Sequence, residues 1–278
     1  MNKRNMQIKI GTLVSILVLV SMIWFGKEGY RAAIAYESLT GTIAKQMDAA
    51  GLAKLKLKEL ASIFTLGMVK NDTKEYLLDL EEKRHATDKR AQQNIVYFSV
   101  GVVVLLLLYF LLPLRGFVVS VSVGALIALI NGLVTPIMLM IVHKQVEYLG
   151  DVVLSFESRG ILGSISKLYD ENNIVVALAV LVFSVIVPLT KSISLLLVAI
   201  YEYSPFASKV VRFFRHLGKW SMLDVFIISI LLVYMTSNNH DISKAEVEIG
   251  LYFFLSYVIL SMVASLAADR MLRSANDS

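Results

Sequence analysis

The chain has 278 residues, of which 56% are hydrophobic and 18% are charged, and its mean hydropathy is +0.67. A soluble domain is less apolar, whereas this chain collects its apolar residues in blocks long enough to cross a bilayer core. The sequence has no cysteine, which excludes disulfides and thiolate metal sites, and its four histidines lie without metal-ligand spacing. The net charge of +5 lies mainly beside the apolar blocks, which indicates membrane orientation and not nucleic-acid binding. We expect a polytopic membrane protein without a metal or cofactor.

Six apolar blocks predict six transmembrane helices, at residues 8–25, 94–112, 117–142, 174–202, 221–237 and 249–268. The first block also has the basic start of a signal peptide and a candidate cleavage site at Ala33-Ile34-Ala35. That site lies late and the apolar core is long, so a retained anchor is the favoured interpretation. The short basic segments then fall on one side and the acidic loops on the other, which predicts that both termini are cytoplasmic.

The long segment 26–93 falls on the outer, periplasmic side of this topology. It is rich in Ala, Leu, Lys and Glu and contains no proline, a composition that favours helix. The stretch from Gly67 to Asp72 breaks the pattern, and Asn71 or Asp72 can cap a second helix. We expect a helical hairpin that prolongs the first two spans outward by roughly 30 Å. It is either a solvated spacer or a docking arm for a partner.

Two shorter segments lie between later spans. In "YSPFASKVVRFFRHLGKW", Ser204 and Pro205 can start a helix whose cations, Lys209, Arg212 and Arg215, and whose Trp220 suit a cytoplasmic membrane surface. A plain charged loop is the alternative. The outer segment 144–173 includes "VEYLGDVVLSFESRG", whose partial alternation is compatible with a short hairpin. It continues as "ILGSISKLYDENN", which predicts a short helix that ends near Asn172 or Asn173.

The fourth predicted span contains a proline and a lysine in the stretch "VFSVIVPLTKSIS". Pro188 cannot donate to the carbonyl of Ser184, so the helix is expected to bend there. Lys191 follows one turn later, and a lysine at the centre of a span costs about 2.5 to 3.5 kcal/mol unless it is compensated. Asp224, the only acid in the fifth predicted span, is the expected partner, with Ser221 on the same helix face.

The third and sixth predicted spans supply further polar groups. Pro136 is expected to free the carbonyl of Gly132, next to Asn131, and the sixth span contributes Ser256, Ser261 and Ser265. One interpretation is a polar core where spans three to six meet, holding the Lys191–Asp224 pair. The other is that small polar residues only hold helices together. A charge combined with a broken helix favours a transport or binding path.

Four stretches of the chain resemble the paraquat-inducible protein A family (PqiA and LetA). "FSVIVPLTKSISLLL" resembles its Ser-x-x-x-Pro-x-x-Lys signature, and "GKWSMLDVFIISILLV" resembles its Gly-[Arg/Lys]-Trp-Ser-Met-Leu-Asp-Val-Phe signature. "NGLVTPIML" is similar to the family's Asn-x-x-x-Pro region, and "ILSMVASLAADR" is similar to its closing helix. The resemblance covers residues 116–272, one four-helix module, and leaves residues 1–113 unmatched.

This resemblance implies an inner-membrane protein of Gram-negative bacteria that works with an MCE-domain protein. The MCE partner forms a periplasmic tunnel, and the membrane protein loads or unloads phospholipid at its base. The family's polar network would map onto a set of five residues here: Ser184, Lys191, Ser221, Asp224 and Ser261. The best-known members have two modules and cysteine zinc ribbons, but this chain has one module and no cysteine. Zinc is therefore not carried over, and a homodimer could replace the missing module.

These inferences combine into one expected architecture and function. The chain is expected to be an all-α polytopic membrane protein, with an N-terminal part at 1–113, a four-helix module at 114–272 and a cytoplasmic tail at 273–278. Its expected function is to pass phospholipid between the inner membrane and the MCE tunnel, without enzymatic activity. A membrane sensor or scaffold is the alternative. A membrane-embedded enzyme is disfavoured, because the sequence contains no paired carboxylates, H-E-x-x-H motif or phosphate loop.

Overall fold

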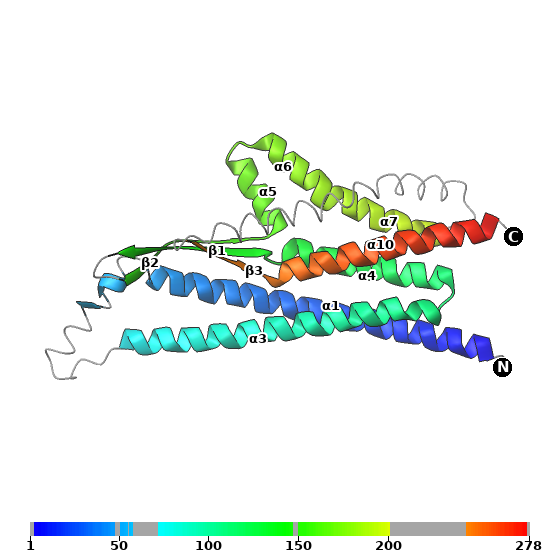
Figure 1. Ribbon diagram of the computed structural model, residues 1–278, viewed down its shortest axis with the longest axis horizontal. Helices are drawn as coiled ribbons and strands as arrows, with labels where there is room; N and C mark the ends of the chain where they lie inside the picture. Colours follow the sequence, from blue (N-terminus) through cyan, green and yellow to red (C-terminus); the bar gives the residue numbers. More distant parts are fainter. Residues whose placement is uncertain are drawn as a thin grey trace.

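The computed structural model describes residues 3–47, 51–54, 56–57, 72–146, 150–200 and 243–276. Within these ranges lie long helices and one small sheet (Figure 1). The main helices are α1 (Lys3–Gln46), α3 (Asp72–Leu107), α4 (Leu114–Val134), α5 (Ile161–Asp170), α6 (Ile174–Leu181), α7 (Val187–Ile200) and α10 (Ile249–Asn276). The short helical turns are η1 (Leu108–Phe110) and η2 (Val182–Ile186), and the strands are β1 (Met138–Val146), β2 (Gly150–Arg159) and β3 (Ser243–Val247).

Five helical stretches of the described chain are long and apolar enough to cross a membrane. They coincide with the first, second, third, fourth and sixth predicted spans, so the prediction of a multi-pass membrane protein is confirmed. The fifth predicted span, 221–237, and the surface helix predicted at 203–220 lie outside the described residues. The count of six spans therefore stays a prediction.

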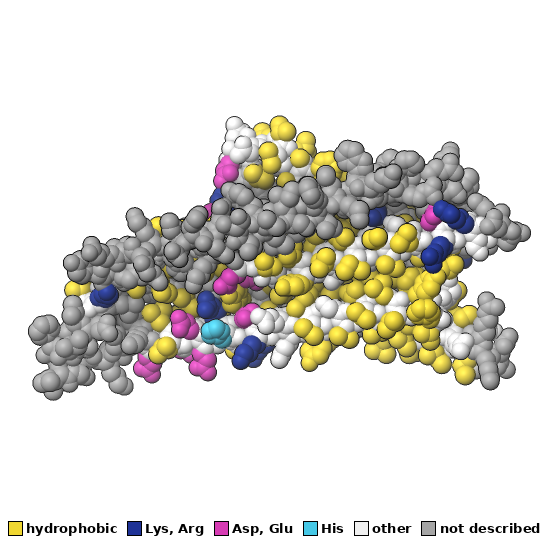
Figure 2. Space-filling view, viewed as in Figure 1, with side chains coloured by type: hydrophobic (Ala, Val, Ile, Leu, Met, Phe, Trp, Pro, Cys, Tyr) yellow, Lys and Arg dark blue, Asp and Glu magenta, His cyan; other side chains and the backbone are white. Residues whose placement is uncertain are grey.

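Helices α1 and α3 are both longer than a membrane is thick. They have 44 and 36 residues, or roughly 66 and 54 Å at 1.5 Å per residue, against a hydrocarbon core of about 30 Å. They run side by side, with apolar side chains over one end of the pair and charged side chains towards the other (Figures 1 and 2). Much of the predicted extension at 26–93 is thus helical. Residues 58–71, where its turn is predicted, lie outside the described ranges.

Helix α4 ends at Val134, so the predicted span 117–142 is wrong in its last eight residues. Thr135 has an extended backbone, with φ −83° and ψ 142°, as expected of a residue that precedes a proline. Pro136 has no N–H with which to continue the helical hydrogen bonds. The chain leaves the helix there and enters β1, which also corrects the prediction of an all-α fold.

The three strands form an antiparallel sheet in the order β2-β1-β3. Met138 of β1 pairs with Arg159 of β2 on one side and with Val247 of β3 on the other. The short hairpin with which the sequence of residues 144–173 is compatible is present as β1 and β2, but it begins six residues earlier than that segment. Buried strand residues of this sheet pack against Ala44 on the polar half of α1. Because open sheet edges do not occur in hydrocarbon, the sheet marks a region beyond the membrane core.

Helix α5 follows the sheet and is joined to β2 by an ion pair. It ends at Asp170, and Asn172 has a positive φ of 63°, which confirms the predicted end near this asparagine. The Glu157 carboxylate of β2 accepts hydrogen bonds from Lys167 of α5, at 2.7 Å, and from Arg159. These two cations hold the pKa of Glu157 below its usual value, with Lys167 having the larger effect.

One hydrophobic core joins α1 and α3 to α4, α7 and α10. Phe98 of α3 meets Phe253 of α10 edge to face, with ring centroids 4.8 Å apart, and both side chains are fully buried. The expected boundary at residue 113 falls in the turn between α3 and α4. The segments on its two sides therefore pack as one body in the described part of the chain.

Candidate intramembrane polar site

The fourth span is interrupted where the sequence predicts a bend. Residues Val182–Ile186 form a π turn, in which the N–H of Val187 bonds to the carbonyl of Val182. Pro188 follows directly, and the Thr190 hydroxyl donates to the carbonyl of Ile186 at 2.8 Å. Ser184, whose carbonyl the proline is predicted to free, lies inside this turn and is half-buried. Single π turns inside α-helices occur frequently at functional sites.

Lys191 lies on α7, three residues after Pro188, and only 6% of its surface is exposed. The neighbouring Ser192 is more deeply buried, at 1%. An ammonium group this far from water needs compensation by an opposite charge, polar groups or bound water. Its predicted partner, Asp224, and the nearby Ser221 lie outside the described residues, so that pair stays a prediction.

Hydrogen bonds between helices establish the register around Lys191. Arg115, at the start of α4, donates to the carbonyls of Ala199 and Ile200, both at 3.0 Å. Helices α4 and α7 run antiparallel (Figure 1), so Ser122 and Ser192, each seven residues from the Arg115–Ala199 contact, lie at the same level.

A second contact places α10 at this level. The Tyr257 hydroxyl of α10 donates to the carbonyl of Pro188 on α7, at 3.4 Å. The two helices run in the same direction (Figure 1), and Ser261 and Ser192 each lie four residues beyond this contact. Four residues are about one helical turn, so both serines lie on the same faces as the contact residues. Ser122, Ser192, Ser261 and Lys191 thus form a polar layer across three helices.

The three serine hydroxyls of the polar layer lack hydrogen-bond partners among the described residues. Ser122 and Ser192 are each 1% exposed and Ser261 is 2% exposed. Buried hydroxyls are nearly always hydrogen-bonded in proteins, so such groups indicate a place for water, a ligand or further protein groups. The Lys191 ammonium belongs to the same layer, and ammonium and hydroxyl groups are the donors that an anionic group such as a phosphate requires.

Sequence reasoning named Ser261 and Lys191 but not Ser122 or Ser192. A serine in a membrane helix is common, and only the register between helices distinguishes these two from serines that hold helices together. Ser120, for example, is bonded both to Ser15 of α1 and to the carbonyl of Gly116. The one available signal in the sequence is that Ser192 lies directly beside the predicted lysine, Lys191.

Other residues of the predicted site lie elsewhere. Asn131 is nine residues from Ser122, roughly 13 Å along α4, and its amide donates to the carbonyl of Ile127 at 2.8 Å. Pro136 ends α4, and its carbonyl accepts the N–H of Gly250 at 3.0 Å. The four residues of the predicted surface helix lie outside the described ranges: Lys209, Arg212, Arg215 and Trp220.

Within the described ranges, no group of three or more His, Asp or Glu side chains could hold a metal ion. The described residues supply the polar layer with one buried ammonium and a set of hydroxyls. These groups can bind, orient or release a polar ligand.

Five long apolar helices that share one core and carry a polar layer with a buried lysine define a multi-pass helical membrane protein. The sequence model of one family, described as paraquat-inducible protein A, matches residues 117–273, more than half of the chain. The protein therefore belongs to the paraquat-inducible protein A family, and the predicted resemblance is confirmed. The match contains the whole polar layer and leaves α1 and α3 outside it. No curated protein and no solved structure matches the chain at a significant level.

Proposed function

We propose that this protein is the membrane subunit of an MCE-type lipid transport system in the bacterial inner membrane. It passes phospholipid between that membrane and a periplasmic tunnel partner, by way of the polar layer around Lys191, and performs no enzymatic step. Membership of the family and the five apolar helices support the assignment. The observation that carries it is the deeply buried Lys191 in a membrane helix interrupted by a π turn and Pro188.

The chemistry of the polar layer suits a phospholipid headgroup. A phosphodiester needs a cation and several hydrogen-bond donors, which Lys191 and the hydroxyls of Ser122, Ser192 and Ser261 can supply. Asp224 is expected to pair with Lys191 when no headgroup is bound. Exchange of the carboxylate for the phosphate then keeps the ammonium compensated throughout the cycle.

The interrupted helix offers a way for the site to open. A π turn next to a proline lacks part of the regular hydrogen-bond ladder, so the helix can change its bend there at lower cost than elsewhere. Helix α6 lies on one side of this turn, and α7, with Lys191, on the other. A change of bend therefore moves α6 relative to the polar layer and changes the access of lipid to it.

The placement of the partner follows from the proposed topology. With both termini in the cytoplasm, the sheet and the extended ends of α1 and α3 stand in the periplasm. They then surround the place where an MCE tunnel must meet the membrane, either as a spacer or as a docking arm. A homodimer would supply the second module that this chain lacks.

Substitution of Lys191 tests the proposal. Lys191→Met keeps the length of the side chain and removes its charge, so the protein should insert normally but fail to complement a lipid-barrier defect of the envelope. Asp224→Asn should have the same effect. Lys27→Met, at an exposed lysine of α1, is the matched control and should complement fully.

Wild-type complementation by both Lys191→Met and Asp224→Asn would overturn transport through this site. It would favour the scaffold alternative, because a scaffold tolerates neutral substitutions at both positions. Protein levels in the membrane fraction, measured for each variant, separate a loss of activity from a loss of the protein.

A further inference from the structure

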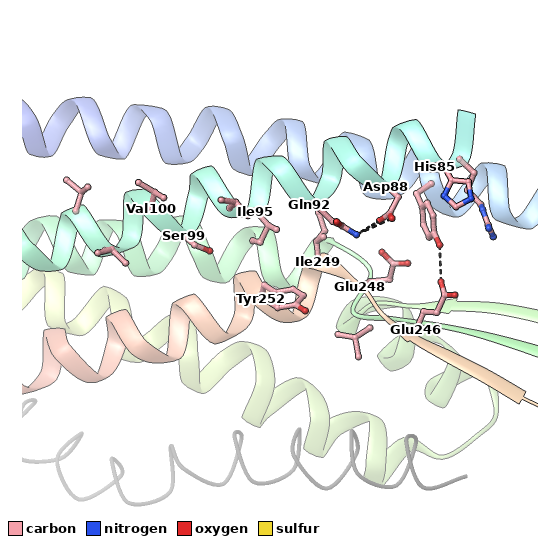
Figure 3. A pocket seen from close by; sticks show the side chains of 16 residues that line it. His85, Asp88, Gln92, Ile95, Ser99, Val100, Glu246, Glu248, Ile249 and Tyr252 are labelled. Carbon is pink, nitrogen blue, oxygen red and sulfur yellow. Dashed lines mark hydrogen bonds between the residues drawn. The ribbon is translucent and has the colours of Figure 1, made fainter. Parts of the chain in front are cut away.

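A hollow of about 940 Å³ lies between α3, the end of β3 and the start of α10 (Figure 3). None of the residues of the polar layer lines it. One wall comes from α3, which lies outside the family match, and the other comes from the module. Its volume is at the upper end of the range of small-molecule sites, about 300 to 1,000 Å³.

The lining of this groove changes from charged to apolar along α3. One end carries Arg84, His85 and Asp88 of α3, opposite Glu246 and Glu248 near the end of β3. The other end has an apolar stripe on α3, which consists of Ile95, Val96, Val100, Val103 and Val104. In Figure 3 the labelled charged residues lie at one end of the groove and Val100 at the other.

The apolar stripe has the length of one membrane leaflet. Residues 95 to 104 rise roughly 14 Å along a helix, which is about half of a 30 Å hydrocarbon core. The change from charged to apolar lining coincides with the predicted start of the second span at residue 94. The groove therefore crosses the membrane surface, with its charged end at headgroup level and its stripe at acyl-chain level.

The charged end has an excess of carboxylates. Glu248 is only 9% exposed, and its own N–H is bonded to the carbonyl of Ile137 at 2.9 Å. Glu246 accepts a hydrogen bond from the Tyr36 hydroxyl at 2.9 Å, and Asp88 accepts bonds from the Gln92 amide at 3.1 and 3.2 Å. Figure 3 shows Glu248 on the side of the groove that faces Asp88 and Gln92.

No salt bridge compensates these three carboxylates within the described residues. Glu248 is the buried one of the three, and a buried carboxylate requires a counter-charge or a proton. Burial and the neighbouring Glu246, Asp88 and Glu37 raise the pKa of Glu248 to about 7. An anionic ligand would meet repulsion here, whereas a cation would supply the missing charge. Arg84 and His85, on the same end, can donate to a phosphate.

We propose that this groove binds one phospholipid whose headgroup carries a cationic amine. The ammonium group lies at Glu248, Glu246 and Asp88. The phosphate lies towards Arg84 and His85. One acyl chain follows the apolar stripe of α3. One wall of the site is α3, which is outside the family match. Binding of a lipid in this groove does not depend on whether lipid is transported past Lys191.

Lipid retention by the purified full-length protein tests this proposal. The protein is mixed in detergent with equal amounts of phosphatidylethanolamine and phosphatidylglycerol of the same acyl chains, and the bound lipid is counted by native mass spectrometry. The wild type should retain mainly the ethanolamine lipid. Glu248→Gln should lower that retention about tenfold, since one charge-assisted hydrogen bond is lost, while the exposed Glu81→Gln should not.

A substitution in the apolar stripe tests the acyl-chain part. Val100→Trp fills the groove and should lower retention of both lipids about tenfold. Val20→Trp is the matched control, because Val20 is also an exposed valine on a membrane helix, at 59% against 54%, and does not line the groove. Melting temperatures in detergent confirm that all variants are folded.

The pH dependence of retention gives a further readout. A bound ammonium favours the charged form of Glu248, so retention of the ethanolamine lipid should rise from pH 6 to pH 8 in the wild type. The charged and titratable groups around Glu248 are Glu246 on β3, Asp88, Arg84 and His85 on α3, and Glu37 and Tyr36 on α1. In His85→Gln, retention of the ethanolamine lipid should therefore still rise from pH 6 to pH 8. In Glu248→Gln, retention should no longer change with pH. Equal retention of the two lipids by the wild type, or unchanged retention in Val100→Trp, would overturn the proposal.

Discussion

The hydroxyl of Tyr257 on α10 donates a hydrogen bond to the carbonyl of Pro188 on α7, at a distance of 3.4 Å. Both side chains are buried. This contact joins the interrupted helix to the last membrane helix, one turn before the level of Lys191 and the polar layer. A change of bend at the π turn must therefore either carry α10 along or break this contact.

Replacement of Pro188 by alanine should stabilise the protein and impair transport. Alanine restores the missing N–H and permits a regular α-helix, so the melting temperature in detergent should rise, while complementation should fall because the bend is lost. Pro113→Ala, at the extended residue before α4, is the control and should slightly lower the melting temperature. Full complementation by Pro188→Ala would show that the bend has no role in transport.

Replacement of the polar-layer serines by alanine should separate stability from function. Ser122→Ala and Ser192→Ala remove hydroxyls without partners in the described chain, so the free energy of unfolding should stay constant or rise by about 1 kcal/mol. Complementation should nevertheless decrease. Ser120→Ala leaves the hydroxyl of Ser15 without its acceptor and should cost about 1 kcal/mol. Equal destabilisation by Ser122→Ala and Ser120→Ala would contradict the polar layer.

Gly250→Ala should unfold or rearrange the junction between α4, the sheet and α10. A Cβ atom at Gly250 would lie 2.4 Å from the carbonyl oxygen of Pro136 and 2.6 Å from that of Thr135. Both are backbone atoms that cannot move aside, so we expect a loss of roughly 3 kcal/mol. Gly163→Ala is the control, since nothing lies within 4 Å of its Cβ position in α5 and alanine favours helix by about 0.5 to 1 kcal/mol. Thermal unfolding in detergent measures both changes.

Glu248 should make stability depend on pH. It precedes the membrane segment of α10, and its pKa is raised from 4.5 to about 7 in the folded protein. Its contribution to stability is therefore fully present below about pH 4.5 and is lost as the pH rises through 7, because the folded state binds the proton more tightly. Glu248→Gln should remove this dependence and exceed the wild type at pH 8 by up to about 3 kcal/mol. Glu81→Gln should keep the wild-type pH profile, and an identical profile for Glu248→Gln would exclude Glu248 as the titrating group.

Local features of the chain were predictable where one physical rule dominates. Apolar runs of membrane length predicted the five membrane-length helical stretches of the described chain, because hydrocarbon leaves the backbone few alternatives. Pro188 predicted the interruption, because its missing N–H removes a hydrogen bond from the same helix. Asn172 and the start of α3 at Asp72 also follow from residues that favour helix ends.

The third predicted span shows where local reasoning fails. Its end, Met138 to Val142, is an apolar run that suits a buried strand as well as a helix. Pairing with β2 and with β3, which is about 100 residues away in the chain, decides that this run is a strand. Sequence alone cannot weigh hydrogen bonds to partners at that distance.

The sequence by itself determined the membrane class, the family, the interrupted helix and the buried lysine, because each depends on residues that are close together in the chain. Only the tertiary structure decided that Ser122, Ser192 and Ser261 lie at one level, and that α3 and the end of β3 form a groove. Both results depend on the register between helices. That register is established by contacts such as Tyr257 to Pro188 and Phe98 to Phe253, whose partners are far apart in sequence.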